Sequence, residues 1–232
     1  MELNSKTRIL VIAAHPDDEV FACGGTLLRA IKAGAAVAVV FLGEGISARF
    51  PFGEYDSQEF HDQTAVRTRS AKNALASLGI ENITFGNRLC CQFDTYAMIS
   101  IVKEIENHIT MFKPSLLFTH NPAEVNIDHR ITFDAVESAC RPTRLDCPKE
   151  IYSFEIVCSG SWTFENTFKP NTYVDVSDYW KEKLIAWHHY EAEARPFPFP
   201  RSDEGLEALA RYRGLSSGLI KAEAFRLIRK VV

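Results

Sequence analysis

The sequence has little excess charge of either sign and no long apolar run. Its 26 Lys and Arg residues stand against 30 Asp and Glu residues, so the formal net charge of the 232-residue chain is −4. A weakly acidic chain offers no basic surface to a phosphate backbone, which argues against a nucleic-acid partner. The first residues contain only a short apolar run before charged residues follow, and they predict neither a signal peptide nor a membrane span. We therefore expect a cytoplasmic protein, without stable membrane insertion, that binds a small molecule.

Two further patterns are missing. No CxxC pair occurs among the six cysteines, and scattered thiols of this kind are usually buried or inert, so we expect no structural zinc–cysteine site. No GxGxxG motif occurs either, because Gly24 and Gly25 fall inside an expected helix instead of the turn before it. This placement argues against a nucleotide-binding module.

Strand and helix patterns alternate along the first 140 residues. Apolar runs typical of buried strands lie at 8–14, 35–43, 83–85 and 115–119, and helical patterns lie at 20–34, 58–78, 96–112 and 128–139. Apolar strands separated by helices favour a mainly parallel sheet that is covered on both faces. The sequence therefore predicts a doubly wound α/β fold with Rossmann-like topology, built as a single domain over 1–232.

The pattern changes after residue 141. Residues 150–157 and 172–176 are typical of strands, 179–194 of an amphipathic helix, and the alternating prolines of RPFPFPRS of an extended connector. We expect residues 1–141 to form the α/β core and residues 142–232 to form a closing extension of strands and a helix.

Polar side chains follow three of the expected strands, in the loops AHPDDE, GEGISARFPFGEY and HNPAEVNIDH. Ligand sites of open parallel sheets lie at the carboxyl ends of the strands. His15 and Asp18 with His129 are the residue types of a catalytic zinc site, in which three protein ligands leave one position open. Asp17 would remain free beside the ion. The alternative, that the acids cap the helix starting there, accounts for one acid but hardly for three, and not for the histidines.

Four motifs occur in a characteristic order: AHPDDE, then GEG, then NIDHR at 126–130, and finally RG followed by AEAF at 213–225. In this order they resemble the LmbE-like or PIG-L family of zinc-dependent N-deacetylases over nearly the whole chain. AHPDDE with a downstream DH is the most specific part of the resemblance.

The resemblance implies that His15, Asp18 and His129 bind Zn²⁺ or another divalent cation, and that Asp17 is the general base. It places Asp128 of the DH pair among the catalytic residues. Family members remove acetyl groups from N-acetylglucosamine units. The resemblance thus implies hydrolysis of the N-acetyl group of a nucleotide sugar, antibiotic or glycan precursor, with release of acetate. Relatives are often oligomers, so a homo-oligomer is compatible with the family.

Two positions depart from the family pattern. Asn126 stands where many relatives have histidine, and an amide can donate a hydrogen bond but cannot carry a mobile proton. We therefore predict that Asn126 is at most an oxyanion donor and that Asp17 alone moves the proton. Cys90 stands where several relatives have a sugar-binding aspartate, a task that Asp94 is the candidate to take over. The departures leave open a non-catalytic, metal-dependent sugar-binding protein, against which the retained Asp17 argues.

Further residues are candidates for substrate contacts. The resemblance implies that Glu44 and Arg67 line the sugar pocket. Arg49, in the loop after the second strand, suits a phosphate or carboxylate, and it is equally compatible with a solvated loop charge. His120, at the end of the fourth strand, is the candidate for a residue behind the metal ligands.

Overall fold

Seven strands form one sheet in the computed structural model, which describes residues 1–232. The strand order is β3-β2-β1-β4-β5-β7-β6. The strands are β1 Arg8–Ala13, β2 Ala36–Gly43, β3 Asn82–Arg88, β4 Leu116–Thr119, β5 Glu150–Phe154, β6 Thr172–Asp175 and β7 Ala222–Lys230. The pairs among β3, β2, β1, β4 and β5 are parallel, and β7 runs antiparallel to β5 and β6. After β1 the chain adds β2 and β3 on one side of β1. It then crosses back and adds β4 on the other side of β1.

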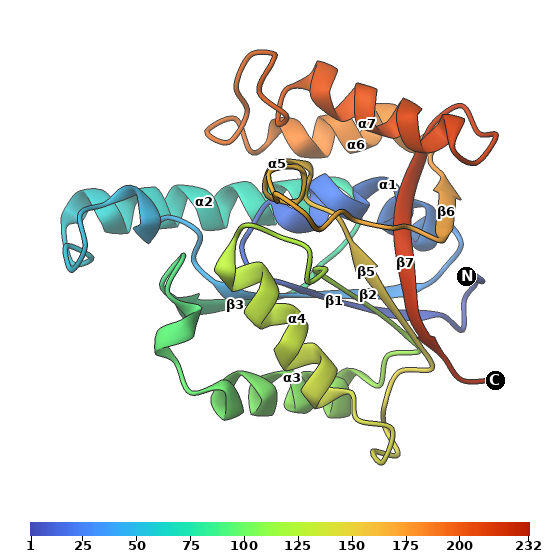
Figure 1. The fold of residues 1–232 in the computed structure, drawn as a ribbon, viewed down its shortest axis with the longest axis horizontal. Coiled ribbons are helices and arrows are strands. Elements are labelled where there is room, and N and C mark those ends of the chain that lie inside the picture. The colour runs from blue at the N-terminus through green and yellow to red at the C-terminus, as the bar shows by residue number, and fades with distance from the viewer.

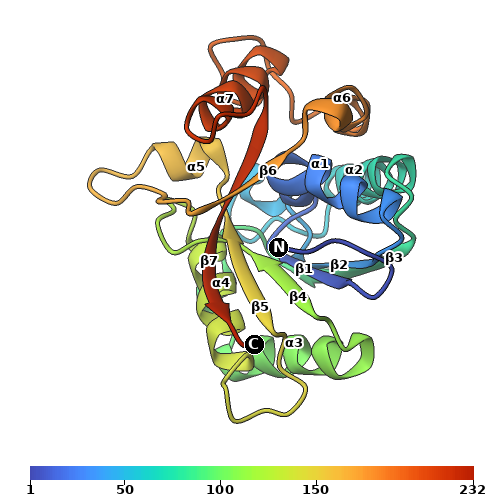
Figure 2. The same cartoon turned by 90° about the vertical axis from the view of Figure 1, so that its right-hand side faces the viewer.

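Helices cover both faces of this sheet (Figure 1). One side carries α1 (Asp18–Lys32) and α2 (Gln58–Ser77), and the other carries α3 (Met98–Phe112) and α4 (Ile127–Ala139), as the rotated view in Figure 2 also shows. Beyond α1 and α2 lie α6 (Trp180–His188) and α7 (Asp203–Leu215), while the short α5 (Val157–Ser161) follows β5. None of the helices combines the length and apolarity that a membrane crossing requires.

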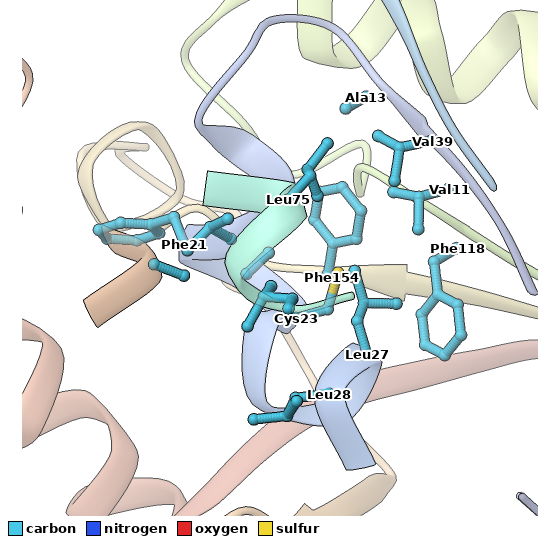
Figure 3. Packing of buried hydrophobic residues seen from close by; sticks show 14 of the residues in the cluster. Val11, Ala13, Phe21, Cys23, Leu27, Leu28, Val39, Leu75, Phe118 and Phe154 are labelled. Carbon is cyan, nitrogen blue, oxygen red and sulfur yellow. The ribbon is translucent and has the colours of Figure 1, made fainter. Parts of the chain in front are cut away.

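The alternating side chains of β1 explain why the strand is apolar throughout. Ile9, Val11 and Ala13 belong to the core beneath α1 and α2, whereas Leu10 and Ile12 belong to the core against α3 and α4. Figure 3 shows the first of these cores, in which Val11 and Val39 of the sheet lie near Leu27 of α1 and Leu75 of α2. A strand with both faces buried needs apolar residues at every position, which produces the continuous run seen in the sequence.

The predicted fold class is confirmed, with differences in the second half. The sheet is mainly parallel and doubly wound, and its first strands and helices lie within a few residues of the expected positions. The helix expected at 179–194 ends at His188, and both α7 and β7 were missed. Strand β7 lies between β5 and β6, so the extension at 142–232 continues the same sheet beyond β4.

Candidate active site

The site lies where the loops after β1 and β4 meet, because these two strands are parallel neighbours. This position is the switch point of the doubly wound sheet, where the crossovers diverge and leave a crevice. His15 comes from the loop after β1, Asp18 begins α1, and His129 lies in the first turn of α4. All three side chains are buried.

The three predicted metal ligands are brought together. One donor atom from each of His15, Asp18 and His129 lies within 4.8 Å of the others. Nδ1 of His15 is 3.8 Å and Nε2 of His129 is 3.6 Å from Oδ2 of Asp18. Burial opposes the charge of Asp18, but His129 and His120 beside it hold its pKa well below the usual range. Oδ1 of Asp18 is buried without a hydrogen-bond partner, so this donor set fits a divalent cation.

Two further carboxylates orient the histidines from behind. Nε2 of His15 is 2.8 Å from Asp128, and Nδ1 of His129 is 3.3 Å from Glu124. Protons on these outer nitrogens leave Nδ1 of His15 and Nε2 of His129 as free lone-pair donors. Asp128 in turn accepts two backbone N–H bonds from residues 91–93. Glu124 was not among the residues predicted from the sequence. Its position five residues before His129, after the same strand, could have indicated a carboxylate near that histidine.

His120 supports this arrangement from the end of β4. Its Nε2 accepts a 2.9 Å hydrogen bond from the backbone N–H of Ala14, and its ring stacks on His129 with 3.9 Å between centroids. Burial lowers the pKa of His120 to about 4, so the ring is neutral near pH 7. It lies behind His129, in the place that the sequence suggested.

The consecutive acids after Pro16 have separate partners. Oδ2 of Asp17 accepts hydrogen bonds from Arg67 at 3.0 Å and Arg201 at 2.6 Å, whereas Glu19 accepts one from the hydroxyl of Tyr190 at 2.6 Å. Asp18, the acid between these two, faces the histidines. Asp17 occupies the N-cap position of α1 but makes no side-chain capping bond. Helix capping therefore does not account for this cluster.

Asp17 lies in a buried ion-pair network. Burial raises the pKa of Asp17 to about 6, although the guanidinium groups of Arg201 and Arg67 favour its charged form. Glu193 completes the network by pairing with Arg67, Arg49 and Arg201. The sequence gave no indication of Arg201 or Glu193, because both lie in the segment after α6 and are far in sequence from their partners.

The predicted substrate residues lie in different surroundings. Arg67 is buried within the ion-pair network, and the half-exposed Arg49 borders the same network. Both line a hollow of about 210 Å³ beside Tyr190. Asp94 is exposed in a short turn after β3. A sugar contact for these residues stays a prediction.

Glu44 holds two loops together. Its carboxylate accepts hydrogen bonds from the backbone N–H groups of Ile46, Ser47 and Cys90, and from the Ser47 hydroxyl. Gly45 beside it has φ +80, and a Cβ there would lie 3.2 Å from Cβ of His15. A glycine is needed for this close approach. The GEG motif thus forms the loop that packs against His15. A sugar contact by Glu44 stays a prediction.

Asn126 is the N-cap residue of α4. Its Oδ1 accepts a 2.9 Å hydrogen bond from the backbone N–H of Asp128. The side-chain oxygen is therefore engaged in capping, while the amide N–H groups remain as donors. Only the amide N–H groups could make the predicted oxyanion contact, which stays a prediction.

Comparisons with known proteins agree with this geometry. Residues 10–140 match the family described as PIG-L: GlcNAc-PI de-N-acetylase. The diacetylchitobiose deacetylase of Thermococcus kodakarensis is 27% identical over 237 residues, covering 97% of this chain and 84% of that protein. The structure of N,N'-diacetylchitobiose deacetylase from Pyrococcus horikoshii, complexed with its inhibitor, superposes with a TM-score of 0.76 at 24% identity, covering 96% of this chain and 84% of the other.

The same fold also carries a different reaction. The 4-carboxy-2-hydroxymuconate hydratase from Pseudomonas putida has a TM-score of 0.72 at 18% identity, covering 97% of this chain and 98% of the other. The fold alone therefore does not select a reaction, which depends on the side chains of the site.

Proposed function

The chain belongs to the PIG-L family, and from this membership we propose that it hydrolyses the N-acetyl group of an amino sugar and releases acetate. The observation that carries the proposal is the buried carboxylate of Asp17, the residue before Asp18 of a three-donor metal set. Binding alone requires no base in this position, so the arrangement favours catalysis over a non-catalytic sugar-binding role. A diacetylchitobiose deacetylase among its relatives supports the same choice.

We propose that His15, Asp18 and His129 hold Zn²⁺ or a similar divalent cation. The unpartnered Oδ1 of Asp18 and the two outer carboxylates support this ligand set. When bound, such an ion polarises an amide carbonyl and makes a water molecule more acidic. Asp128 and Glu124 keep the two imidazoles in the tautomers that this role requires.

Asp17 supplies the proton transfer. Both guanidinium contacts, from Arg67 and Arg201, go to its Oδ2, which leaves Oδ1 to take a proton from the attacking water. The same carboxyl group then passes the proton to the departing amine. Asn126 donates a hydrogen bond to the carbonyl oxygen as negative charge develops there.

Acetate release tests the proposal. The Zn²⁺-loaded protein is incubated with N,N'-diacetylchitobiose, N-acetylglucosamine and N-acetylated nucleotide sugars, and free acetate is measured. We expect release from at least one of these sugars, loss of release after chelation, and recovery when Zn²⁺ is added back. Asp17→Asn should bind the metal normally while activity falls by about 10²–10⁴-fold. Absence of acetate across the panel, with one ion bound per chain, would favour the sugar-binding alternative.

A further inference from the structure

We propose that Cys90, Asp128 and Nε2 of His15 form a second site, which takes soft divalent cations such as Cd²⁺ or excess Zn²⁺. One donor atom from each residue lies within 4.8 Å of the others, and all three side chains are buried. Thiolate, imidazole and carboxylate together are ligands that zinc and softer ions prefer over Mg²⁺ or Ca²⁺. The site is assembled from three separate segments, which explains why cysteine spacing did not predict it.

The two ring nitrogens of His15 face two different donor sets. Nδ1 points toward Asp18 at 3.8 Å, while Nε2 lies 2.8 Å from Oδ2 of Asp128. Nitrogen and oxygen ligands about 2.0–2.2 Å from a tetrahedral ion are roughly 3.3 Å apart. The His15–Asp128 pair therefore has to open by only about half an ångström to admit an ion.

Cys91 offers a further sulfur next to Cys90. Its Sγ is 3.9 Å from Sγ of Cys90, and Cys91 is exposed where Cys90 is buried. Two sulfurs about 2.3 Å from one tetrahedral ion are about 3.8 Å apart, so the observed separation already suits shared coordination. The backbone N–H of Cys91 is bonded to Asp128 and that of Cys90 to Glu44, which holds this turn of the chain beside Asp128.

Occupation of this second site would inhibit the enzyme, a consequence that rests on the proposed function. An ion on Nε2 displaces to solvent the proton that His15 donates to Asp128, and coordination by Cys90 likewise releases its thiol proton to solvent. His15 then loses the contact that orients Nδ1 toward Asp18 and His129. Outer hydrogen bonds of this kind typically change metal affinity or activity 10- to 100-fold when they are lost.

A Cd²⁺ titration of the Zn²⁺-loaded protein tests the site. Bound ions are counted per chain, the ultraviolet thiolate-to-Cd²⁺ charge-transfer band is followed, and acetate release is measured in parallel. We expect one additional ion, a growing band, and activity that falls at least 10-fold as the band saturates. Cys90→Ser should lose the band and the additional ion, and should retain its activity in the presence of Cd²⁺.

Cys147→Ser is the matched control, because Cys147 is a partly exposed thiol that contacts Arg229 instead of His15. It should keep the band and the inhibition. A band that survives in both Cys90→Ser and Cys90→Ala, or that disappears in Cys147→Ser, would overturn the proposal. The first-site Zn²⁺ retained by each variant reports that it is folded. Since the band and the ion count need no substrate, this test remains decisive even if no acetate release is found.

Discussion

The chemistry of the neighbouring acids depends on what each carboxylate contacts in the folded chain. Asp17 is held by guanidinium groups, and Asp18 lies among imidazoles. Guanidinium groups stay protonated, so they orient Asp17 without competing for its proton-transfer role. The imidazoles around Asp18 can release their protons and become ligands instead. The different contacts of these two adjacent aspartates are the reason for proposing separate tasks for them, base for Asp17 and metal ligand for Asp18.

Arg201 is expected to position Asp17 for proton transfer. Its Nη1 lies 2.6 Å from Oδ2 of Asp17, and charge-assisted hydrogen bonds contribute about 1.5–3 kcal/mol. Arg201→Ala should therefore lower kcat by about 10- to 100-fold, with a smaller change in KM. Steady-state kinetics of acetate release measures both parameters. Arg69→Ala, an exposed position on α2, is the control and should leave both unchanged. An equal change in kcat for the two variants would argue against a positioning role.

At the residue scale, the sequence indicated the proposed metal ligands better than the groups that contact them. His15, Asp17 and Asp18 lie in one short motif, and the strand before it indicates where the motif sits in the sheet. Arg201 reaches Asp17 across 184 residues of chain. No local pattern encodes such a contact, because it depends on how the segment after α6 packs over α1.

The elements that begin at the site are held by their first residues. Helix α4 starts at Ile127 after the cap at Asn126, and its first turn carries Asp128 and His129. The cap therefore fixes the direction in which both side chains leave the helix. This gives Asn126 a structural task beside the predicted oxyanion contact.

Two substitutions separate these tasks of Asn126. Asn126→Ala removes both the cap and the amide donor, so unfolding should become easier by about 1 kcal/mol and turnover should fall without being abolished. Asn126→Ser restores a capping oxygen but not the amide donor, so it should recover the stability and not the turnover. Urea denaturation and acetate release measure the two effects. Turnover equal to that of the unmodified protein in both variants would count against a catalytic contact.

At the element scale, burial determined which strands the sequence predicted. Strands β1, β2 and β4 are buried on both faces and have continuous apolar runs. Strand β7 is buried only in its first half, where Glu223 interrupts the apolar residues, and is alternately exposed in its second half. Because it contains a buried glutamate and several charged residues, this strand has no continuous apolar run by which the sequence would indicate it.

At the scale of the whole molecule, strand β7 ties the C-terminal extension to the rest of the domain. It pairs with β5 and β6 in the sheet, while its Glu223 reaches α1 and α6. The extension also delivers Arg201 to Asp17 and Glu193 to Arg67. The extension thus completes both the sheet and the surroundings of Asp17 when it docks onto α1.

The buried ion pair between Lys183 and Glu223 should be the main polar support of that docking. Their charged atoms are 2.6 Å apart, and Glu223 also accepts backbone N–H bonds from Gly25 and Thr26. Lys183→Met leaves the Glu223 charge buried without its counterion, which should cost about 3–5 kcal/mol of unfolding free energy.

Urea denaturation of matched variants tests this expectation. Lys32→Met removes the same side-chain type from an exposed pair with Glu182 and should cost less than about 1 kcal/mol. The double variant Lys183→Met with Glu223→Gln should regain part of the loss, because no buried charge then remains unpaired. Equal unfolding midpoints for Lys183→Met and Lys32→Met would show that the buried pair does not hold the extension. In that case the apolar contacts between α1 and α6, such as Phe21 against Trp187, must carry the docking on their own.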